Sequence, residues 1–411
     1  MYNRWPVFAL APFSLASAVS AVALGVCASL ALLGCSSGLK LTAIKSAQNR
    51  TSNVAVYFKV QASSGEPIGG LTAEQFRIYE DDALVSHYES KQTILNPEVA
   101  ASHYTLLLVD MSGSVSGSGS VDKLVEAATA FTDRVEKFQK VGVYAFDGSE
   151  ELTPIVPFTD APGGAKAGVK QLQTFKPRDP STNLNGAVVK GLDELDKALA
   201  RAEHPMRFGT LVVFTDGTDR ASRVPADTMR KKIKDTKYDV FAIGLGAEIK
   251  EDQLKDVGKD GTAMAADKEQ VSKAFDTIGA RIEAQTKSYY LLSYCSPARA
   301  GKHEVRIEAV AKDKDGKTEK TGSLKSQFDA AGFAPGCDPK TPPTFDVTKG
   351  DALAPPKADK EKDKEPGKSE KSDAPKATPK PPPGAGPKLP PPPPPPPLAP
   401  TPPPPKDDFA P

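Results

Sequence analysis

Several features of enzyme active sites are scarce in this chain of 411 residues. The four histidines, which lie in unrelated segments, are His87, His103, His204 and His303. The four cysteines form no CxxC pair, and no Gly-x-x-x-x-Gly-Lys-Ser/Thr loop is present. Neither Ser112 nor Ser114 lies in a Gly-x-Ser-x-Gly elbow. Zinc or redox chemistry, nucleotide binding and serine hydrolysis are therefore not indicated, and we expect no enzymatic activity.

A surplus of charge of one sign is also absent. The chain has 53 Lys and Arg against 52 Asp and Glu, which gives a formal net charge of +1. No basic stripe with interleaved aromatic residues stands out. Since nucleic-acid binding relies on such a positive field, we expect no nucleic-acid partner.

The N-terminus has the features of a targeting segment. Arg4 supplies a positive end, and the run from Val7 to Gly34 is apolar and free of charge. Leu32-Leu33-Gly34-Cys35, followed by Ser36, resembles the lipobox of bacterial lipoproteins, in which the cysteine is acylated and the preceding peptide is removed. The resemblance implies a signal peptide over 1–34, a lipid anchor at Cys35 and a polar tether over 35–50. A plain membrane anchor that contains Cys35 is the alternative.

This resemblance also implies a location and a redox environment. The protein would be lipid-anchored in the cell envelope, and Ser36 favours the outer membrane over the inner one by analogy with enterobacterial sorting rules. Cys295 and Cys337 lie outside the targeting segment. In an oxidising exterior such a pair is expected to form a disulfide.

The middle of the chain, 103–287, has the pattern of an α/β domain. The continuous apolar run TLLLVD ending at Asp110 is typical of a strand buried on both faces of a parallel sheet. Further strands are expected at 141–146, 152–158, 210–217 and 239–246, and helices at 121–138, 165–175, 184–202 and 271–284. This alternation predicts a doubly wound parallel sheet.

Small β segments flank the α/β domain on both sides. Before it, over 51–98, we expect strands at 53–60, 76–79 and 85–88. After it, over 288–337, we expect strands at 289–294 and 303–311. The flanks form either one sandwich into which the α/β domain is inserted or two separate β units.

The last segment, 338–411, differs from the rest in composition. It is rich in Lys, Asp, Glu and Ala, then becomes almost pure proline, with an unbroken run from Pro390 to Pro397. Such a segment cannot bury enough apolar area to offset chain ordering, and its prolines favour polyproline II. We expect a disordered tail that acts as a spacer or as a ligand for aromatic grooves.

The candidate metal-binding residues begin in one loop, from Asp110 to Ser114. Asp110-Met111-Ser112-Gly113-Ser114 follows the central strand and resembles the Asp-x-Ser-x-Ser signature of the metal-ion-dependent adhesion site in von Willebrand factor A and integrin I domains. That family completes its site with a threonine and an aspartate from two later loops, and Thr182 and Asp216 stand in the expected order. Magnesium prefers such hard oxygen ligands.

The resemblance implies a function. A Mg²⁺ or Mn²⁺ ion held by Asp110, Ser112, Ser114, Thr182 and Asp216 would accept a carboxylate from a protein partner. One departure is that Pro180 and Ser181 stand where the family often has glycines, which makes this loop stiffer without loss of a ligand oxygen. The alternative is a domain of the same fold that binds no metal, in which Asp110 only caps the turn.

The flanks extend the resemblance. SSGEPIGGLTAEQFRIYEDD and YYLLSYCSPARAGKHEVRIEA resemble the flanks of a bacterial group of von Willebrand factor A-related proteins, over roughly 51–310. We therefore expect a membrane-anchored lipoprotein that captures a protein ligand with an acidic side chain. The competing hypothesis is an envelope scaffold or assembly protein that acts mainly through its proline-rich tail.

Overall fold

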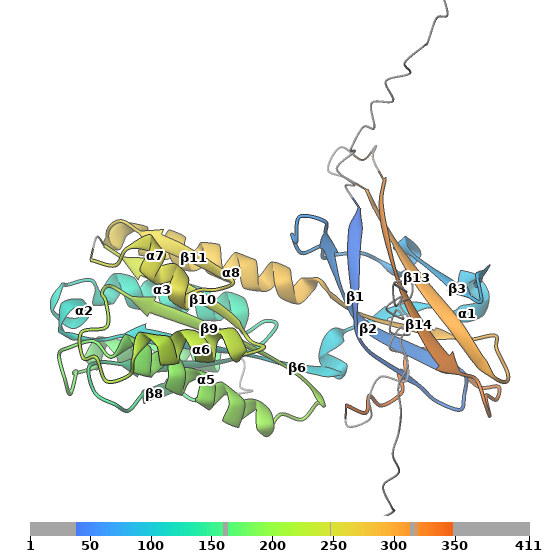
Figure 1. Ribbon diagram of the computed structural model, residues 1–411, viewed down its shortest axis with the longest axis horizontal. Coiled ribbons are helices and arrows are strands. Elements are labelled where there is room, and N and C mark those ends of the chain that lie inside the picture. Colours follow the sequence, from blue (N-terminus) through green and yellow to red (C-terminus); the bar gives the residue numbers. More distant parts are fainter. Residues whose placement is uncertain (1–37, 159–162, 247, 313–315, 317–318, 348–411) are drawn as a thin grey trace, which may run out of the picture. The chain divides into compact units, whose positions relative to one another are not determined.

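The computed structural model describes residues 38–158, 163–246, 248–312, 316 and 319–347. These residues form an α/β unit and a β-sandwich (Figure 1). The predicted signal peptide and Cys35 lie outside the described residues. Within the described part, no helix is both long and apolar enough to cross a membrane.

The α/β unit is built on a six-stranded sheet in the order β11-β10-β9-β6-β7-β8. All neighbouring strands are parallel except β8, which pairs antiparallel with β7 at one edge. The predicted doubly wound sheet is thus confirmed. The strands are β6 Ala101–Asp110, β7 Lys140–Phe146, β8 Thr153–Val156, β9 Met206–Thr215, β10 Asp239–Leu245 and β11 Gly261–Ala265.

Helices cover both faces of this sheet because successive residues of a buried strand point to opposite sides. On β6, Leu107 and Val109 pack into one apolar core and Leu106 and Leu108 into the other. The first core is closed by α3 Val121–Val135, α4 Gly164–Gly168, η3 Val169–Thr174 and α8 Val271–Lys287. The second core is closed by α5 Leu184–Ala200, α6 Ala226–Asp235 and α7 Glu251–Val257.

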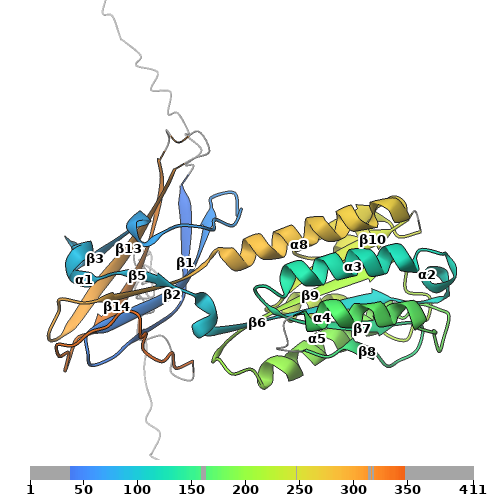
Figure 2. The same cartoon turned by 180° about the vertical axis from the view of Figure 1, so that it is seen from behind.

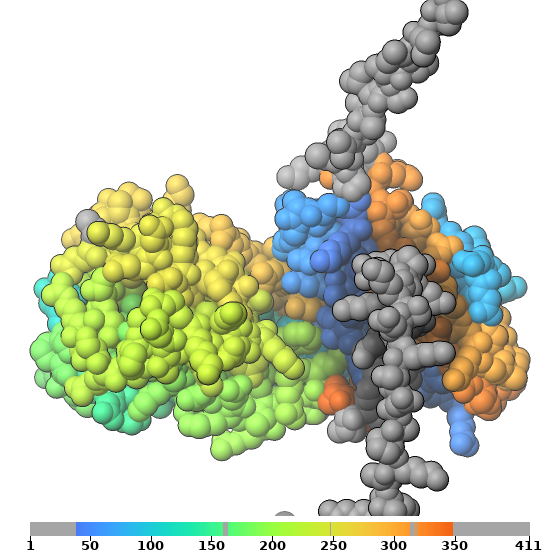
Figure 3. All heavy atoms as spheres, viewed as in Figure 1, coloured from blue at the N-terminus to red at the C-terminus, as the bar shows by residue number. Residues whose placement is uncertain are grey.

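The two helical layers can be followed in two opposite views. Helices α5, α6 and α7 face the viewer in Figure 1, and α3, α4 and α8 face the viewer in Figure 2. In the space-filling view, α5 to α7 form a continuous green-to-yellow surface over the sheet (Figure 3). Two short elements complete the unit, α2 Gly113–Gly117 and η4 Lys268–Gln270.

The β-sandwich combines strands from both flanks of the α/β unit. One sheet has the order β1-β2-β12-β5 and the other β14-β13-β3-β4. Each sheet mixes strands that precede and follow the insertion, so the flanks form one sandwich rather than two β units. The strands are β1 Leu39–Gln48, β2 Asn53–Ala62, β3 Phe76–Glu80, β4 Ala83–Leu84, β5 Thr93–Leu95, β12 Tyr289–Cys295, β13 Lys302–Lys312 and β14 Glu319–Asp329.

Aromatic side chains fill the core between the two sheets. The rings of Phe58 and Phe76 lie 5.5 Å apart edge to face, and Tyr290 packs against both. Three short helices lie along the connections, η1 Ala73–Gln75, α1 His87–Ser90 and η2 Pro97–Val99.

The expected tether over 35–50 is wrong from Leu39 to Gln48, because this interval is strand β1. It pairs antiparallel with β2, and Leu39 is buried in the sandwich core. The other side chains of β1 are mostly half-buried or exposed, so its sequence lacks the apolar run that marks an inner strand. Pairing with β2, rather than its own composition, makes this segment a strand.

The expected strand at 85–88 is also wrong. Asp81 and Asp82 both have positive φ angles, 48° and 64°, which is typical of a tight hairpin turn. The returning strand therefore pairs at once, as Ala83–Leu84, and the chain then enters helix α1.

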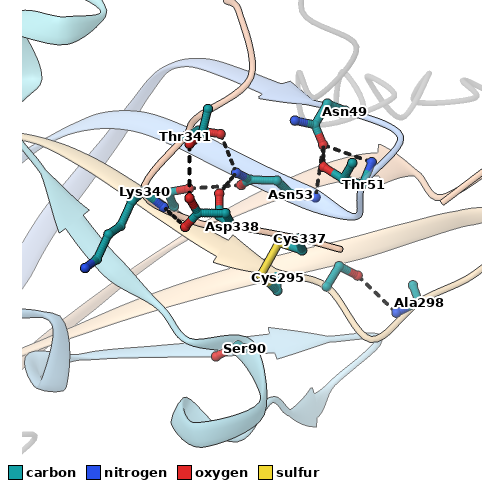
Figure 4. Close-up of a disulfide and its surroundings, with 12 residues drawn as sticks. Asn49, Thr51, Asn53, Ser90, Cys295, Ala298, Cys337, Asp338, Lys340 and Thr341 are labelled. Carbon is teal, nitrogen blue, oxygen red and sulfur yellow. Dashed lines mark hydrogen bonds between the residues drawn. A yellow bond between two sulfur atoms is a disulfide. The ribbon is translucent and has the colours of Figure 1, made fainter. Parts of the chain in front are cut away.

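The tail begins later than residue 338. Cys337 is disulfide-bonded to Cys295 at the end of β12, with 5.8 Å between their Cα atoms (Figure 4). The Asn53 side-chain amide donates hydrogen bonds to the carbonyls of Asp338 and Thr341, at 2.9 and 2.8 Å. Phe345 is only 4% exposed. These contacts hold the chain in place as far as Phe345, and 348–411 of the predicted tail lies outside the described residues.

Phe345 belongs to a small apolar cluster that links the sandwich to the insertion. Tyr57 and Leu291 of the sandwich and Ala101 and Met206 of the α/β unit pack together with Phe345. Of these residues, Ala101 is the first of β6 and Met206 the first of β9. The candidate site lies at the opposite end of these strands, where β6 and β9 terminate.

Candidate metal-ion site

The candidate site lies where two adjacent parallel strands end. Strands β6 and β9 are in register, with Val109 opposite Phe214. The carboxyl ends of parallel strands meet at one edge of the sheet, where open α/β folds usually bind ligands. Asp110 and Asp216 therefore come together, although about a hundred residues separate them in the chain.

The first loop is held around the carboxylate of Asp110, which is fully buried. Oδ1 of Asp110 accepts a hydrogen bond from the backbone N–H of Ser112 at 3.0 Å. Oδ2 accepts one from the hydroxyl of Thr215 at 2.7 Å. The two hydroxyls of Ser112 and Ser114 lie 3.1 Å apart. The loop thus gathers one carboxylate and two hydroxyls within a few ångströms.

Ser114 connects the first loop to the third. Its hydroxyl donates a hydrogen bond to Oδ1 of Asp216 at 2.9 Å. One hydrogen-bonded network therefore connects Asp110, Ser112, Ser114 and Asp216. The sequence predicted all of these residues for the site.

The middle loop brings Thr182 to the same edge through backbone hydrogen bonds. The carbonyl of Thr182 accepts from the N–H groups of Arg220 and Ala221, both at 2.9 Å. The preceding carbonyl of Pro180 accepts from Gly113 N–H at 2.9 Å. Thr182 is only 3% exposed, and its hydroxyl has no hydrogen-bond partner among the described residues.

Pro180 and Ser181 stiffen the middle loop. Oδ1 of Asp179 accepts from both the N–H and the hydroxyl of Ser181, at 2.9 and 2.8 Å. The guanidinium of Arg223 pairs with the other oxygen of Asp179 at 2.9 Å. Asn183 then caps helix α5 by accepting from Gly186 N–H. These contacts fix the loop without using a predicted metal ligand.

The two carboxylates are in an environment that disfavours their charge. The pKa of Asp110 is raised from its ordinary 3.8 to about 7, chiefly by burial; the nearby Asp216 carboxylate also raises it, whereas hydrogen bonds from Ser112 and Thr215 lower it. Burial also raises the pKa of Asp216, with Glu248 adding to the effect and Ser114 and Arg220 opposing it. Neither aspartate forms an ion pair within the part of the chain that the structure describes. A divalent cation would offset both charges.

The donor set fits magnesium or manganese better than zinc. It combines two carboxylates with three hydroxyls, and magnesium takes hard oxygen ligands while keeping several waters. No cluster of three or more His, Cys, Asp or Glu suited to a metal occurs among the described residues. The candidate site has only two carboxylates, those of Asp110 and Asp216, and its other predicted ligands are hydroxyls.

Sequence reasoning missed Thr215, whose hydroxyl is buried against Asp110. Its only signal is its place directly before Asp216 at the end of β9. It also missed Asp147, at the end of β7, which accepts hydrogen bonds from the N–H groups of Ser149 and Arg178. Neither is predicted to touch a metal, and both position the loops that carry the ligands.

Gly148 yields a first prediction. Its N–H donates to the carbonyl of Asp179 at 3.0 Å, and a Cβ at this position would overlap the hydroxyl of Ser181. Gly148→Ala should therefore displace the loop that carries Thr182 and weaken cation binding about tenfold or more. Calorimetric titration with Mn²⁺ measures this effect, and Gly117→Ala, where a Cβ meets nothing within 4 Å, is the control. Equal affinity in both variants would contradict the prediction.

The histidines provide no general base at this site. His103 is buried at the start of β6, where it bonds to the Tyr57 hydroxyl, and burial lowers its pKa to about 4. His303 pairs with Asp81 in the sandwich at 2.7 Å. No hydrogen bond joins any of the four histidines to the residues of the candidate site in the described ranges.

A comparison with known protein families identifies the domain in the middle of the chain. Residues 105–218 match the von Willebrand factor type A domain family, and this range contains every predicted metal ligand. A comparison with curated proteins found no match.

Several solved structures are similar. A von Willebrand factor type A protein from Catenulispora acidiphila is 12% identical, with 72% of this chain and 74% of that chain covered and a TM-score of 0.38. Proximal thread matrix protein 1 from the mussel byssus, with a zinc-occupied MIDAS motif, is 17% identical, with 44% and 48% covered and a TM-score of 0.38. The manganese-loaded TRAP protein of Plasmodium vivax is 14% identical, with 60% and 99% covered and a TM-score of 0.37.

This chain spans about half the length of the mussel protein. The family match rests on the central segment, whose strands and loops have been described above. Residues 105–218 of this chain therefore belong to a von Willebrand factor type A domain.

Proposed function

We propose that this protein captures a protein partner through a divalent cation, magnesium or manganese. Asp110, Ser112, Ser114, Thr182 and Asp216 would hold the ion. Domains of this family commonly mediate protein–protein adhesion through such a site. The observation that carries the proposal is that two carboxylates without ion pairs and the hydroxyls of Ser112 and Ser114 meet where β6 and β9 end, beside the loop that carries Thr182.

The residues of the chain have separate parts in this function. The cation, when bound, supplies a positive centre with an open position for a partner's carboxylate. Asp110 and Asp216 provide the charge that retains the ion, and the hydroxyls complete its shell. Thr215 orients Asp110 through its hydrogen bond of 2.7 Å. None of these steps requires bond cleavage in the partner, so we propose a binding protein and not an enzyme.

An envelope pull-down tests this function. The full chain should retain a partner in magnesium and lose it in chelator, and Asp110→Ala should lose it in both. Capture that persists in chelator but disappears on removal of 348–411 would overturn the proposal and favour the scaffold acting through the proline-rich segment.

We further propose that Cys35 is acylated and anchors the protein in the cell envelope, at the outer membrane in preference to the inner one. The motif Leu32-Leu33-Gly34-Cys35 supports this. Stable anchoring follows because each buried CH₂ of an acyl chain contributes about 0.8 kcal/mol. Cys35→Ala should accumulate as an uncleaved precursor without label from a fatty-acid analogue. Cys27→Ala is the matched control, and label that survives Cys35→Ala would refute the anchor.

A further inference from the structure

An exposed ion pair stands beside the candidate metal site. Nη2 of Arg220 lies 2.5 Å from Oε2 of Glu248, and the two side chains are 62% and 61% exposed. The carboxylate of Glu248 lies near Gly217, the residue that follows Asp216, because a Cβ on Gly217 would lie 4.0 Å from its Oε2. Both charges act on the Asp216 carboxylate. The pair thus lies at the rim where a partner's carboxylate would approach.

Arg220 differs from its neighbours in how it is held. Arg178 and Arg223 each bond to a backbone carbonyl of the framework, those of Glu151 and Gly148. The main chain of Arg220 is equally fixed, since its N–H donates to the Thr182 carbonyl. Its guanidinium, however, is bonded to the exposed Glu248. The backbone of Arg220 is therefore held by the loop that carries Thr182, whereas its guanidinium is exposed to solvent.

We infer that Arg220 is a second anchor for the partner and that Glu248 is its internal counter-ion. The site would then select a segment with two nearby carboxylates, one for the metal ion and one for Arg220. This inference rests on the proposed metal-bridged function.

The electrostatics favour replacement of Glu248 by a carboxylate of the partner at the guanidinium of Arg220. An exposed ion pair contributes little net stability, so releasing Glu248 from Arg220 costs little. A guanidinium can bind a carboxylate with two parallel hydrogen bonds, and such a contact strengthens when a partner excludes water. Glu248 also repels an incoming carboxylate. Arg220 should therefore raise affinity for a second acidic residue, and Glu248 should lower affinity for any acidic ligand.

Short acetylated peptide amides test this. The probes are Asp-Asp and Asp-Gly-Asp, each compared with the peptide whose last Asp is Asn. The full chain is loaded with Mn²⁺, and binding is followed through water-proton relaxation as peptide displaces water from the ion. Wild type should prefer a two-carboxylate peptide about tenfold in at least one spacing. Arg220→Gln should remove this preference, Arg220→Lys should retain part of it, and Glu248→Gln should raise affinity for all four peptides about threefold.

Matched variants separate local from general charge effects. Arg77 and Glu308 form an ion pair on the sandwich, so Arg77→Gln and Glu308→Gln remove the same charges elsewhere and should change nothing. Equal binding of two-carboxylate and one-carboxylate peptides by wild type, or a preference that survives Arg220→Gln, overturns the anchor. Unchanged or lower affinity in Glu248→Gln overturns the counter-ion. Failure of every peptide to displace water from bound Mn²⁺ overturns the metal-bridged function itself.

Discussion

Asp110→Asn should abolish cation binding and yet make the metal-free protein more stable at pH 8. The carboxyl of Asp110 is fully buried without an ion pair, and burial raises its pKa from 3.8 to about 7. At pH 8 the metal-free wild type therefore holds a buried charge that the amide lacks. We expect a gain of about 2 to 4 kcal/mol in the free energy of unfolding, the size that such a pKa shift implies.

The pH dependence follows from the direction of this shift. In the folded protein Asp110 binds its proton up to about pH 7, whereas in the unfolded chain it loses the proton near pH 4. Its contribution to stability is complete below pH 4 and is lost as the pH rises through 7. The cation binds the carboxylate and competes with the proton. Magnesium should thus stabilise the wild type more at pH 8 than at pH 5.

Denaturant unfolding in chelator and in magnesium, at both pH values, measures these effects. Asp147→Asn is the control, because it removes a carboxyl at the end of the neighbouring strand β7. Burial alone would raise the pKa of Asp147, but hydrogen bonds from Ser149 and Arg178 outweigh it and lower the pKa. This variant should lose stability at pH 8. The same loss in Asp110→Asn, or its continued stabilisation by magnesium, would contradict the prediction.

Removal of the disulfide should have the second large effect. The bond between Cys295 and Cys337 closes a loop with a sequence separation of 42 residues, which corresponds to about 4 kcal/mol on the chain-entropy model. It also holds the segment that continues through Asp338 and Thr341 to the buried Phe345 (Figure 4). Cys295→Ser/Cys337→Ser should therefore unfold at lower denaturant and be cleaved by protease within 338–347.

Two comparisons isolate the bond itself. A reductant should lower the stability of wild type to that of the double variant, and it should leave the double variant unchanged. Phe345→Ala should loosen 338–347 without altering the response to reductant. Two free thiols in the non-reduced protein, counted by mass spectrometry, would show that the bond is not formed.

The central strand and the loop of the candidate metal site could be predicted from local sequence. The run TLLLVD is apolar on both alternating faces, so it could only be an inner strand with helices on either side. The loop from Asp110 to Ser114 is a moderate signal by itself, because short polar loops are common, and it became a strong one together with Thr182 and Asp216. Thr182 could be added because it precedes a recognisable helix, and Asp216 because it follows a recognisable strand.

Other elements lacked a local signal. Helix α6 buries only Met229 and Ile233, and β11 is a strand of five small or half-exposed residues at the sheet edge. Strand β1 exists through its pairing with β2, and residues 338–347 are ordered through the disulfide and contacts to Asn53. In each case a contact outside the segment stabilises it, whether with the next strand, as for β1, or with residues far away in the sequence, as for 338–347.

The sequence by itself determined the fold class and the order of the main elements, and it singled out the loop of the candidate metal site, because neighbouring residues show both how a strand is buried and which side chains carry oxygen atoms. The tertiary structure decided what depends on distant contacts. It joined the two flanks into one sandwich, placed Thr215 against Asp110, and set Arg220 and Glu248 beside Asp216. These pairs come from strands and loops that meet only when the sheet has formed, since parallel strands bring their carboxyl ends to a common edge.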